Sequence, residues 1–413
     1  MKIAVWHNLP SGGGKRALYY HVRGLVERGH TVECWSLSTG DHAYLPLREF
    51  APEHIIPATP AVVPTPRFGR TMLSEYFEAV ARMQAFEADC QRAAGEIEAG
   101  DFDLLFANSS VPFYMPYIMR HVRRPKILYL QEPYRPLYEA DPMLPWVEGV
   151  HDSLKEAYLR HPRLFVYEYL RLHALRLQAR QEWLNAQACD EILVNSYYSR
   201  ESVLRVYGRE VKVCYLGIDT EQFRSLNRVR ERFIAGLGSC DNIKGIDLAI
   251  RSIALLPEPQ PPLVWLANSG SDSYRKAMIE LAESLGVKLD LRSRVSDEEL
   301  VEVLNRATAL VYTSHLEPFG FAPLEANACA TPVVAVAEGG VRETMRDGVN
   351  GILVDREPEE IARALQSLLD DERLARRMGE NAAAYVRQEW SIERSVDRLE
   401  EHLLRTVRAK QQS

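Results

Sequence analysis

Residues 309–329 read ALVYTSHLEPFGFAPLEANAC, and this stretch decides the fold that we expect. Its apolar start, Ala309–Thr313, is typical of a buried strand, and Leu324–Cys329 is typical of a helix. A turn containing Gly320 joins the two, and glycine in such a turn lets a ligand approach the backbone closely. The free N–H groups at the start of a helix favour an anion. The stretch therefore predicts a strand, an anion-binding turn and a helix.

Two carboxylates flank this turn. Glu317 lies in the turn itself, and we expect Glu325 in the first turn of the helix, so that both can point at one ligand. A carboxylate accepts hydrogen bonds from hydroxyl groups such as those of a sugar. From the spacing alone, a plain helix start with acidic residues near its positive end is an alternative.

Outward from this unit, short apolar strands alternate with helical stretches along the chain. We expect strands at 3–6, 31–37, 103–107, 126–130, 191–195 and 211–215, and again at 232–237, 263–267, 288–292, 309–313, 332–336 and 351–354. Such alternation is typical of a parallel sheet covered by helices on both faces. The pattern restarts after Gly217, so the sequence predicts two doubly wound α/β domains, with ligands bound beyond the carboxyl ends of the strands.

The composition is that of an ordinary globular protein. The chain has 413 residues, of which 46% are apolar and 26% charged, and its formal net charge is −7. An acidic chain is not typical of a nucleic-acid binder, so we expect no nucleic-acid partner. No apolar run approaches the roughly 20 residues that span a bilayer. The six scattered cysteines have no metal or redox spacing, and without a recognisable signal peptide they indicate a cytoplasmic protein.

The residues after the helix strengthen the functional prediction. Residues 330–354 read ATPVVAVAEGGVRETMRDGVNGILV. Together with EPFGFAPLE at 317–325, this block closely resembles the C-terminal signature of the retaining glycosyltransferases of family four, with Ala330 where glycine is usual. The resemblance implies the GT-B fold, in which two Rossmann-like domains face a central cleft. Residues 1–217 would form the acceptor side and 218–390 the nucleotide-sugar side, with a terminal helix, 391–413, that crosses back onto the N-terminal domain.

The resemblance also assigns roles on the donor side. In the family the first carboxylate, here Glu317, contacts the hydroxyls of the donor sugar, and the second, here Glu325, binds the ribose. A basic pair lies on the diphosphate, and the segment GSCDNIKG at 238–245 supplies Lys244 but has Ser239 where arginine is usual. One cation on the leaving group is therefore expected, and the second position stays open. The backbone would hold the diphosphate and the sugar at Phe319, Gly320, Phe321, Ala322 and Leu324.

The N-terminal half carries weaker signals. The glycine loop with Gly13 and Gly14 resembles the family's loop near the diphosphate and acceptor, although a plain strand–helix turn fits these residues equally well. Where the family usually has a histidine near the reacting sugar, this chain has Gln131, which can donate a hydrogen bond but cannot titrate. The further candidates for the acceptor side are Asn108, Ser109 and Arg135.

These residues predict a retaining transferase that moves a hexose from a nucleotide-diphosphate sugar to a hydroxyl of a glycan, lipid-linked or small-molecule acceptor. Backbone N–H groups and Lys244 would stabilise the leaving diphosphate, so no metal and no cofactor is expected. The stretch Asp101–Asp103 fits a helix-to-strand turn better than a metal site. UDP-sugars are favoured over GDP-sugars, because a branch resembling lipopolysaccharide-core glucosyltransferases also carries Gly-Ser at 238–239.

Two alternatives belong to other functional classes. One is a GT-B epimerase that acts on the sugar nucleotide without an acceptor. The other is a nucleotide-sugar-binding protein that has lost catalysis, which Ser239 and Gln131 motivate. A nicotinamide dehydrogenase is disfavoured, because neither glycine loop has the G-x-G-x-x-G fingerprint.

The stretch 160–180 holds five arginines among aromatic residues, a pattern that fits a membrane surface or an acidic acceptor. At 100° per residue, Arg160, Arg163 and Arg171 fall on one side of a helix, and Arg176 and Arg180 lie nearly opposite. Because this divides the charge, we favour a solvated helix beside the acceptor site over a weak peripheral contact with the inner face of the membrane.

Overall fold

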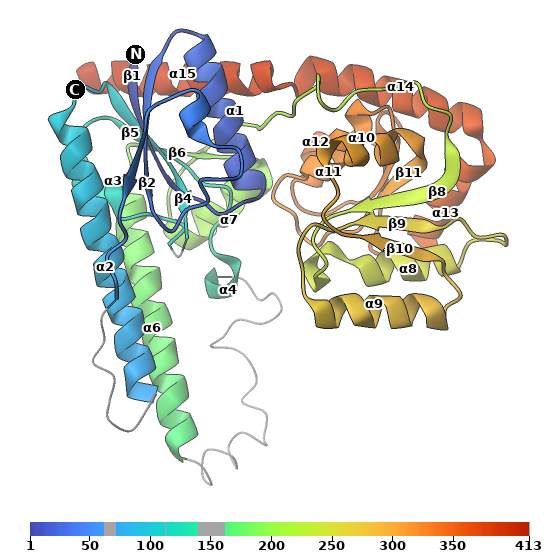
Figure 1. The fold of residues 1–413 in the computed structure, drawn as a ribbon, viewed down its shortest axis with the longest axis horizontal. Coiled ribbons are helices and arrows are strands. Elements are labelled where there is room, and N and C mark those ends of the chain that lie inside the picture. The colour runs from blue at the N-terminus through green and yellow to red at the C-terminus, as the bar shows by residue number, and fades with distance from the viewer. Residues whose placement is uncertain (62–71, 112, 139–161, 413) are drawn as a thin grey trace. The chain divides into compact units, whose positions relative to one another are not determined.

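The computed structural model describes residues 1–61, 72–111, 113–138 and 162–412. The chain divides into two compact units. Unit 1 consists of Met1–Asn195, Ser199–Cys214 and Val396–Ser413, and unit 2 of Ser196–Tyr198 and Tyr215–Ser395. Each unit is built around its own sheet (Figure 1).

The described part of unit 1 has a seven-stranded parallel sheet in the order β3-β2-β1-β4-β5-β6-β7. The strands are β1 (Lys2–Asn8), β2 (Thr31–Leu37), β3 (Glu53–Ile56), β4 (Leu104–Ser110), β5 (Lys126–Tyr129), β6 (Glu191–Val194) and β7 (Lys212–Val213). The central strands are buried along nearly their whole length, as expected for parallel strands covered on both faces. The strand order reverses between β1 and β4, which makes this the switch point of the sheet.

Helices cover both faces of this sheet. They are α1 (Gly13–Glu27), the 3₁₀ turn η1 (Leu47–Glu49), α2 (Met72–Ala99), α3 (Ile118–His121), α4 (Arg135–Tyr138), α6 (Pro162–Gln187) and α7 (Tyr197–Tyr207). The helices α2, α3 and α6 lie on one face and α1 on the other (Figure 1). Phe86, Cys90 and Ile97 of α2 anchor one core against the sheet. No helix in the described ranges is long and apolar enough to cross a membrane.

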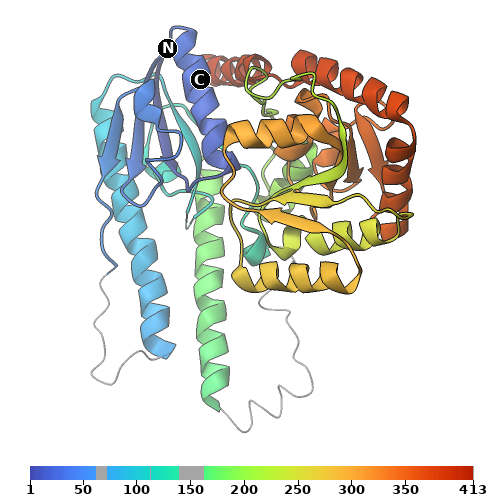
Figure 2. The ribbon, with the colours of Figure 1, turned by 45° about the vertical axis from the view of Figure 1, so that its right-hand side comes forward.

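The described part of unit 2 repeats the same architecture, with a six-stranded parallel sheet in the order β10-β9-β8-β11-β12-β13. The strands are β8 (Glu231–Leu237), β9 (Leu263–Leu266), β10 (Leu289–Arg292), β11 (Ala307–Tyr312), β12 (Val333–Val336) and β13 (Gly351–Val354). The helices are η2 (Asn242–Lys244), α8 (Ile246–Ala254), α9 (Asp272–Ser284), α10 (Asp297–Arg306), α11 (Phe321–Ala328), α12 (Val341–Thr344), α13 (Pro358–Asp370) and α14 (Glu372–Glu389). The helices α8 and α9 cover one face, and α10 and α11 the other (Figures 1 and 2). The two sheets confirm the predicted class of two doubly wound α/β domains.

The last helix, α15 (Ile392–Gln411), begins in unit 2 and continues in unit 1. Within unit 1 it packs closely on α1, because a Cβ on Gly24 would lie only 2.5 Å from a methyl carbon of Val396. Arg28 of α1 pairs with Glu400 at 2.8 Å and with Asp397 at 2.6 Å. The glycine and these ion pairs hold α15 against unit 1.

Three local predictions are wrong. Glu325 is the fifth residue of α11, not part of its first turn, because the helix begins directly after Gly320. Gly13 and Gly14 form the first turn of α1 and are not loop residues. The strand predicted to end at Ala107 is β4, which extends to Ser110 and so includes Asn108 and Ser109. The short edge strand β3 was not predicted at all, since only the last of its four residues is buried.

Candidate functional site

The loops that follow β8 and β11, Gly238–Gly245 and Thr313–Gly320, meet at the switch point of the unit 2 sheet. The two strands are neighbours, and the strand order reverses between them. Carboxyl ends at such a point form the ligand crevice of open α/β sheets. Thr313 Oγ1 donates to the carbonyl oxygens of Lys244 and Gly245 at 3.0 and 2.8 Å. The two loops therefore form one structure, called the switch-point platform below.

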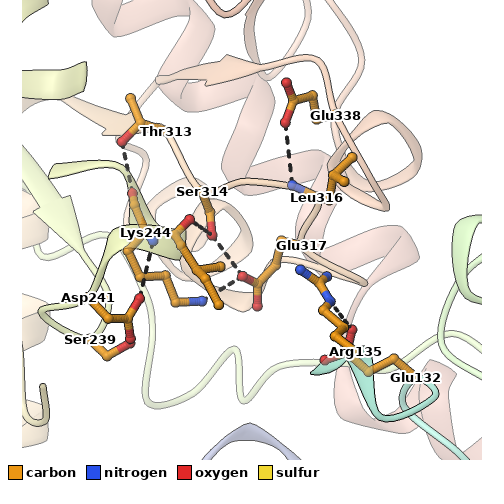
Figure 3. A network of polar contacts seen from close by, with 12 residues as sticks. Glu132, Arg135, Ser239, Asp241, Lys244, Thr313, Ser314, Leu316, Glu317 and Glu338 are labelled. Atoms are coloured by element: carbon orange, nitrogen blue, oxygen red, sulfur yellow. Dashed lines mark hydrogen bonds and ion pairs between the residues drawn. The ribbon is translucent and has the colours of Figure 1, made fainter. Parts of the chain in front are cut away.

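The central pair of the platform is Lys244 and Glu317. Lys244 Nζ lies 2.5 Å from Glu317 Oε2, and the two side chains are only 21% and 24% exposed. Ser314 Oγ donates to the same carboxylate oxygen at 2.8 Å, and Figure 3 shows both groups directed at it. A half-buried ammonium is suited to a phosphate oxygen and a carboxylate to sugar hydroxyls. The two functions of a sugar-phosphate site thus lie side by side.

Ser239 does not supply a second cation, and its hydroxyl is engaged within the loop. Ser239 Oγ donates to Asp241 Oδ2. The other oxygen of Asp241 accepts from the backbone N–H of Lys244 at 3.3 Å, which caps the short helix η2. Gly245 at the end of η2 has a φ of +66°, and a Cβ there would lie 2.5 Å from Thr313 O. Asp241 and Gly245 thus fix the backbone on either side of the Lys244 side chain.

The start of α11 presents backbone donors rather than side chains. Gly320 is its N-cap, with φ 90°, and no side chain caps the first turn. The side chains of Phe319 and Leu324 are 3% and 0% exposed. Among the predicted donor-binding residues 319–322 and 324, Phe321 and Ala322 are partly exposed, whereas Phe319 and Leu324 are too buried to meet a ligand. The N–H groups of a first helical turn and the helix dipole favour an anion at this position.

A pair of glycines after β12 sets the path of the turn that carries Glu317. Gly340 N donates to Glu317 O at 2.8 Å, and a Cβ on Gly340 would lie 2.0 Å from Pro318 O. Gly339 has a φ of +57°, and a Cβ there would lie 2.3 Å from Glu317 O. Only glycine permits this close approach, so the two residues determine where the turn sits.

A second layer of charge, which sequence reasoning missed, lies behind the platform. Arg356 donates to the carbonyl oxygens of Thr313 at 3.1 Å and Ser314 at 2.9 Å, and it pairs with Glu338 at 2.7 and 2.8 Å. Glu338 also lies 2.8 Å from His315 Nδ1. Burial opposes the charge of Glu338, but Arg356 and His315 hold the pKa of its carboxyl below the usual value. The layer ties the ends of β11, β12 and β13 together.

The signal for this layer was present but weak. Glu338 and Arg356 each stand two residues beyond the end of a strand, at the carboxyl edge where ligand sites form. The two residues pair because β12 and β13 are neighbours in the sheet, and this strand order cannot be read from the sequence. The carboxylate of Glu325, by contrast, was predicted from the motif, and this residue is 3% exposed within α11.

The candidates from the N-terminal half gather at the carboxyl edge of the unit 1 sheet. Gln131 follows β5, and its Oε1 accepts from Asn195 Nδ2 at 2.9 Å. Asn108 and Ser109 lie near the carboxyl end of the neighbouring strand β4 and are 1% and 6% exposed. Arg135 opens α4 and pairs with Glu132 at 2.6 Å. Gly13 and Gly14 begin α1 beside the same edge, after β1.

A buried polar cluster lies next to this glycine turn, and it too was missed. His7 near the end of β1 lies 3.8 Å from Glu53 of β3, which is also 3.2 Å from His42. Burial lowers the pKa of His7 to about 4 and lowers the pKa of Lys15, whereas hydrogen bonding to His7 lowers that of Glu53 to about 2. The Lys15 ammonium is buried in the first turn of α1 without a hydrogen-bond partner among the described residues. At neutral pH His7 in this cluster is therefore uncharged and Glu53 is ionised.

The described part of the chain contains no cluster of side chains suited to a metal ion. No group of three or more His, Cys, Asp or Glu residues there is arranged to hold an ion. The carboxylate of Asp103 instead accepts from the backbone N–H of Lys2 at 2.7 Å. Asp103 thus joins the starts of β1 and β4, as expected for a turn residue.

The fold is shared with known glycosyltransferase structures. The crystal structure of Anabaena Alr3699/HepE in complex with UDP aligns over 98% of this chain and 99% of that chain, with a TM-score of 0.72 and 18% identity. Its complex with UDP-glucose aligns with a TM-score of 0.70, over 98% of this chain and 99% of that one, at 18% identity. Sucrose-phosphate synthase from Thermosynechococcus elongatus covers 99% and 100%, with a TM-score of 0.70 and 19% identity. The architecture is therefore GT-B.

Family models identify both halves of the chain. The model for Glycosyltransferase Family 4 matches residues 11–222, about half of the chain, and that for Glycosyl transferases group 1 matches residues 218–385. The protein belongs to glycosyltransferase family 4. A D-inositol 3-phosphate glycosyltransferase of Streptomyces bingchenggensis is 30% identical over 224 residues, or 48% of this chain and 49% of the relative. The chain spans about half the length of the curated relatives it matches.

Proposed function

We propose that this protein is a retaining, metal-independent glycosyltransferase that moves a hexose from a UDP-sugar to a hydroxyl of a glycan, lipid-linked or small-molecule acceptor. The observation that carries the proposal is the Lys244–Glu317 pair at the switch point of unit 2, in the loop that contains η2 and the loop that leads into α11. Family membership and the UDP and UDP-glucose complexes of the HepE structures support it.

Stabilisation of the leaving diphosphate is the main catalytic task of this site. When the bond between the anomeric carbon and the phosphate oxygen breaks, negative charge grows on the diphosphate. Lys244 and the first N–H groups of α11 are held in place before the reaction, so they stabilise that charge without reorganising. No acid on the leaving group is needed, in contrast to a glycosidase with its two flanking carboxylates.

Orientation of the sugar falls to Glu317. Its carboxylate accepts hydrogen bonds from hydroxyls of the hexose, while Ser314 and Lys244 hold it in place. The acceptor hydroxyl attacks from the face that the diphosphate leaves, and a phosphate oxygen of the leaving group takes its proton. Retention of configuration follows from this front-face path.

The second candidate is a nucleotide-sugar-binding protein without transfer activity. Two observations favour it: the Ser239 hydroxyl is bonded to Asp241 in place of an arginine, and Gln131 stands where histidine is usual. The first candidate is preferred because the platform retains its cation and its carboxylate in contact.

The test is donor turnover with a panel of acceptors. UDP-glucose, UDP-galactose and GDP-mannose are incubated with acceptors in chelator-treated buffer, and nucleotide release and the anomeric configuration of the product are followed by NMR. An α-linked product from an α-linked UDP-sugar supports the proposal. Binding of the donor with no turnover on any acceptor would favour the binding protein, and isomerised sugar nucleotide would favour an epimerase.

A further inference from the structure

The helix α6 presents one of its faces to the rest of unit 1. Tyr167, Leu170 and Ala174 line the same cavity as Tyr76 and Met83 of α2. The two helices run side by side with their N-terminal ends together (Figures 1 and 2). The rotation of α6 about its axis is therefore set by packing against α2.

The C-terminal part of α6 is fixed even more firmly. Glu182 is fully buried and accepts from Tyr207 at 2.9 Å and from Tyr138 at 3.1 Å. Asn185 Nδ2 donates to Met115 O at 2.7 Å. Together with the α2 contacts, these bonds leave the opposite side of α6 facing away from the unit.

That opposite side carries an exposed stripe of aromatic rings and arginines, called the α6 stripe. It consists of Phe165, Tyr169, Arg176, Arg180 and Trp183. At 100° per residue, these five positions fall within an arc of about 60°. The three rings are 56%, 59% and 47% exposed, and both arginines are exposed. The two groups of arginines seen in the sequence therefore lie on different sides of α6, with Arg176 and Arg180 on the side that faces away from α2. Arg160 lies outside the described residues.

The α6 stripe is positive although the chain as a whole has a net charge of −7. It contains no acidic residue, and Arg176 and Arg180 form no ion pair with any described residue. The two acidic residues of α6 lie elsewhere, since Glu168 pairs with Arg171 at 3.7 Å and Glu182 is buried. The positive charge of the stripe is therefore available to an anionic partner.

Apolar exposure increases toward the N-terminal ends of the helix pair. Leu73 and Phe77 of α2 are 55% and 53% exposed, and Val166 of α6 is 48% exposed. Aromatic side chains beside arginines are typical of helices that lie in the interface of a bilayer, where tyrosine and tryptophan place their polar atoms among the headgroups. From Phe165 to Trp183 the stripe is about 27 Å long, enough to lie flat on a membrane.

We propose that the α6 stripe binds the surface of an anionic lipid bilayer, with the rings at headgroup depth and Arg176 and Arg180 on the phosphates. A second copy of the chain fits the stripe less well, because two such stripes would bring four arginines together. The proposal does not depend on the transfer reaction. It gives the protein a fixed attachment face, whichever sugar it uses.

The experiment is sedimentation of the full chain with vesicles, without donor or acceptor. Vesicles of phosphatidylcholine alone are compared with vesicles that also contain phosphatidylglycerol. Wild type should sediment with the anionic vesicles only, and R176E/R180E should lower the partition coefficient roughly tenfold or more. The matched control is R373E/R377E on α14, which changes the same charge at two exposed positions one turn apart and should stay within about twofold of wild type.

A second variant separates the rings from the charge. Y169S/W183S should weaken binding to anionic vesicles while leaving the thermal unfolding midpoint near that of wild type, since both side chains are about half exposed. Equal partitioning into the two kinds of vesicle, or equal losses in R176E/R180E and R373E/R377E, would overturn the proposal. A dimer seen by light scattering that Y169S/W183S dissociates would overturn it in favour of self-association.

Discussion

The Nζ of Lys244, from the loop after β8, lies 2.5 Å from Glu317 Oε2, from the loop after β11. The residues are 73 apart in the sequence, and they meet because their strands are neighbours at the reversal of strand order. In the proposed reaction the pair separates its tasks, with the ammonium on the diphosphate and the carboxylate on the sugar. Although the contact couples the two side chains, their single substitutions should differ in how they change turnover and UDP affinity.

Replacement of Glu317 by alanine should abolish transfer but spare nucleotide binding. The variant loses the acceptor of sugar hydroxyl bonds, and kcat should fall about a hundredfold or more. The affinity for UDP should change by only a few-fold, because UDP has no hexose. Steady-state kinetics and calorimetry measure the two quantities. Glu360→Ala, an exposed carboxylate on α13, is the control, and turnover of E317A equal to that control would refute the role of Glu317.

Replacement of Lys244 by alanine should affect both quantities. Loss of the cation that meets the diphosphate should weaken UDP binding and lower kcat by about 10²–10³, the range for removal of one electrostatic donor. Lys276→Ala, at an exposed lysine on α9, should leave both values unchanged. Wild-type kinetics in K244A would mean that another cation serves the diphosphate.

Arg356 is expected to act through the position of Glu317. Its bonds to the carbonyls of Thr313 and Ser314 hold the loop that presents the carboxylate. R356A should therefore lower kcat about ten- to hundredfold, with little change in the affinity for UDP. R356K should recover part of the loss, because lysine can reach one carbonyl but not form the fork. If Arg356 had only a structural role, R356A would lower the unfolding midpoint without lowering kcat more than the affinity for UDP. R363A on α13 is the control for the loss of an arginine.

Gly340→Ala tests the close approach at the turn. The new Cβ would lie 2.0 Å from Pro318 O, so the backbone must shift, at a cost of about 1–3 kcal/mol in the free energy of unfolding. Donor turnover should fall with it. Gly95→Ala in α2 is the control: nothing lies within 4 Å of its Cβ, so it should be neutral or stabilise by about 0.5–1 kcal/mol. Equal stability of the two variants would contradict the packing described for Gly340.

Acid should destabilise the protein through its buried histidines. Burial lowers the pKa of His7 and of His21 to about 4, from 6.5. Between these values the unfolded chain binds protons that the folded chain does not, so stability is lost as the pH falls from about 6.5 toward 4. Urea unfolding at pH 7 and pH 5 measures the loss. His21→Asn should show a smaller difference between the two pH values, and an unchanged difference would exclude His21 as a contributor.

The alternation of strands and helices could be predicted because most strands are apolar runs bounded by turns. The exceptions have physical reasons. β3 is four residues long with one buried side chain, so its sequence carries little signal. The start of α11 was placed too late because Gly320 allows the helix to begin at once, with Pro323 inside its first turn.

Within the candidate site, the sequence motif indicated Glu317, Lys244 and the backbone of the turn at 319–324. The supporting layer of Glu338, Arg356 and His315 could not be predicted, because its members come from three strands whose order in the sheet is not written in the sequence. The same holds for His7 and Glu53, which meet only because β3 lies at the edge beyond β2. The side of α6 that faces outward could likewise be identified only from the packing of α6 against α2.

The donor site is tested by calorimetric titration of wild type and K244A with UDP, GDP and ADP in metal-free buffer, repeated with magnesium. Wild type should bind UDP with micromolar affinity without metal and bind GDP and ADP more weakly, and K244A should lose at least tenfold in affinity for UDP. Absence of binding by all three nucleotides, or equal UDP affinity in wild type and K244A, would contradict a donor site built on Lys244 and Glu317.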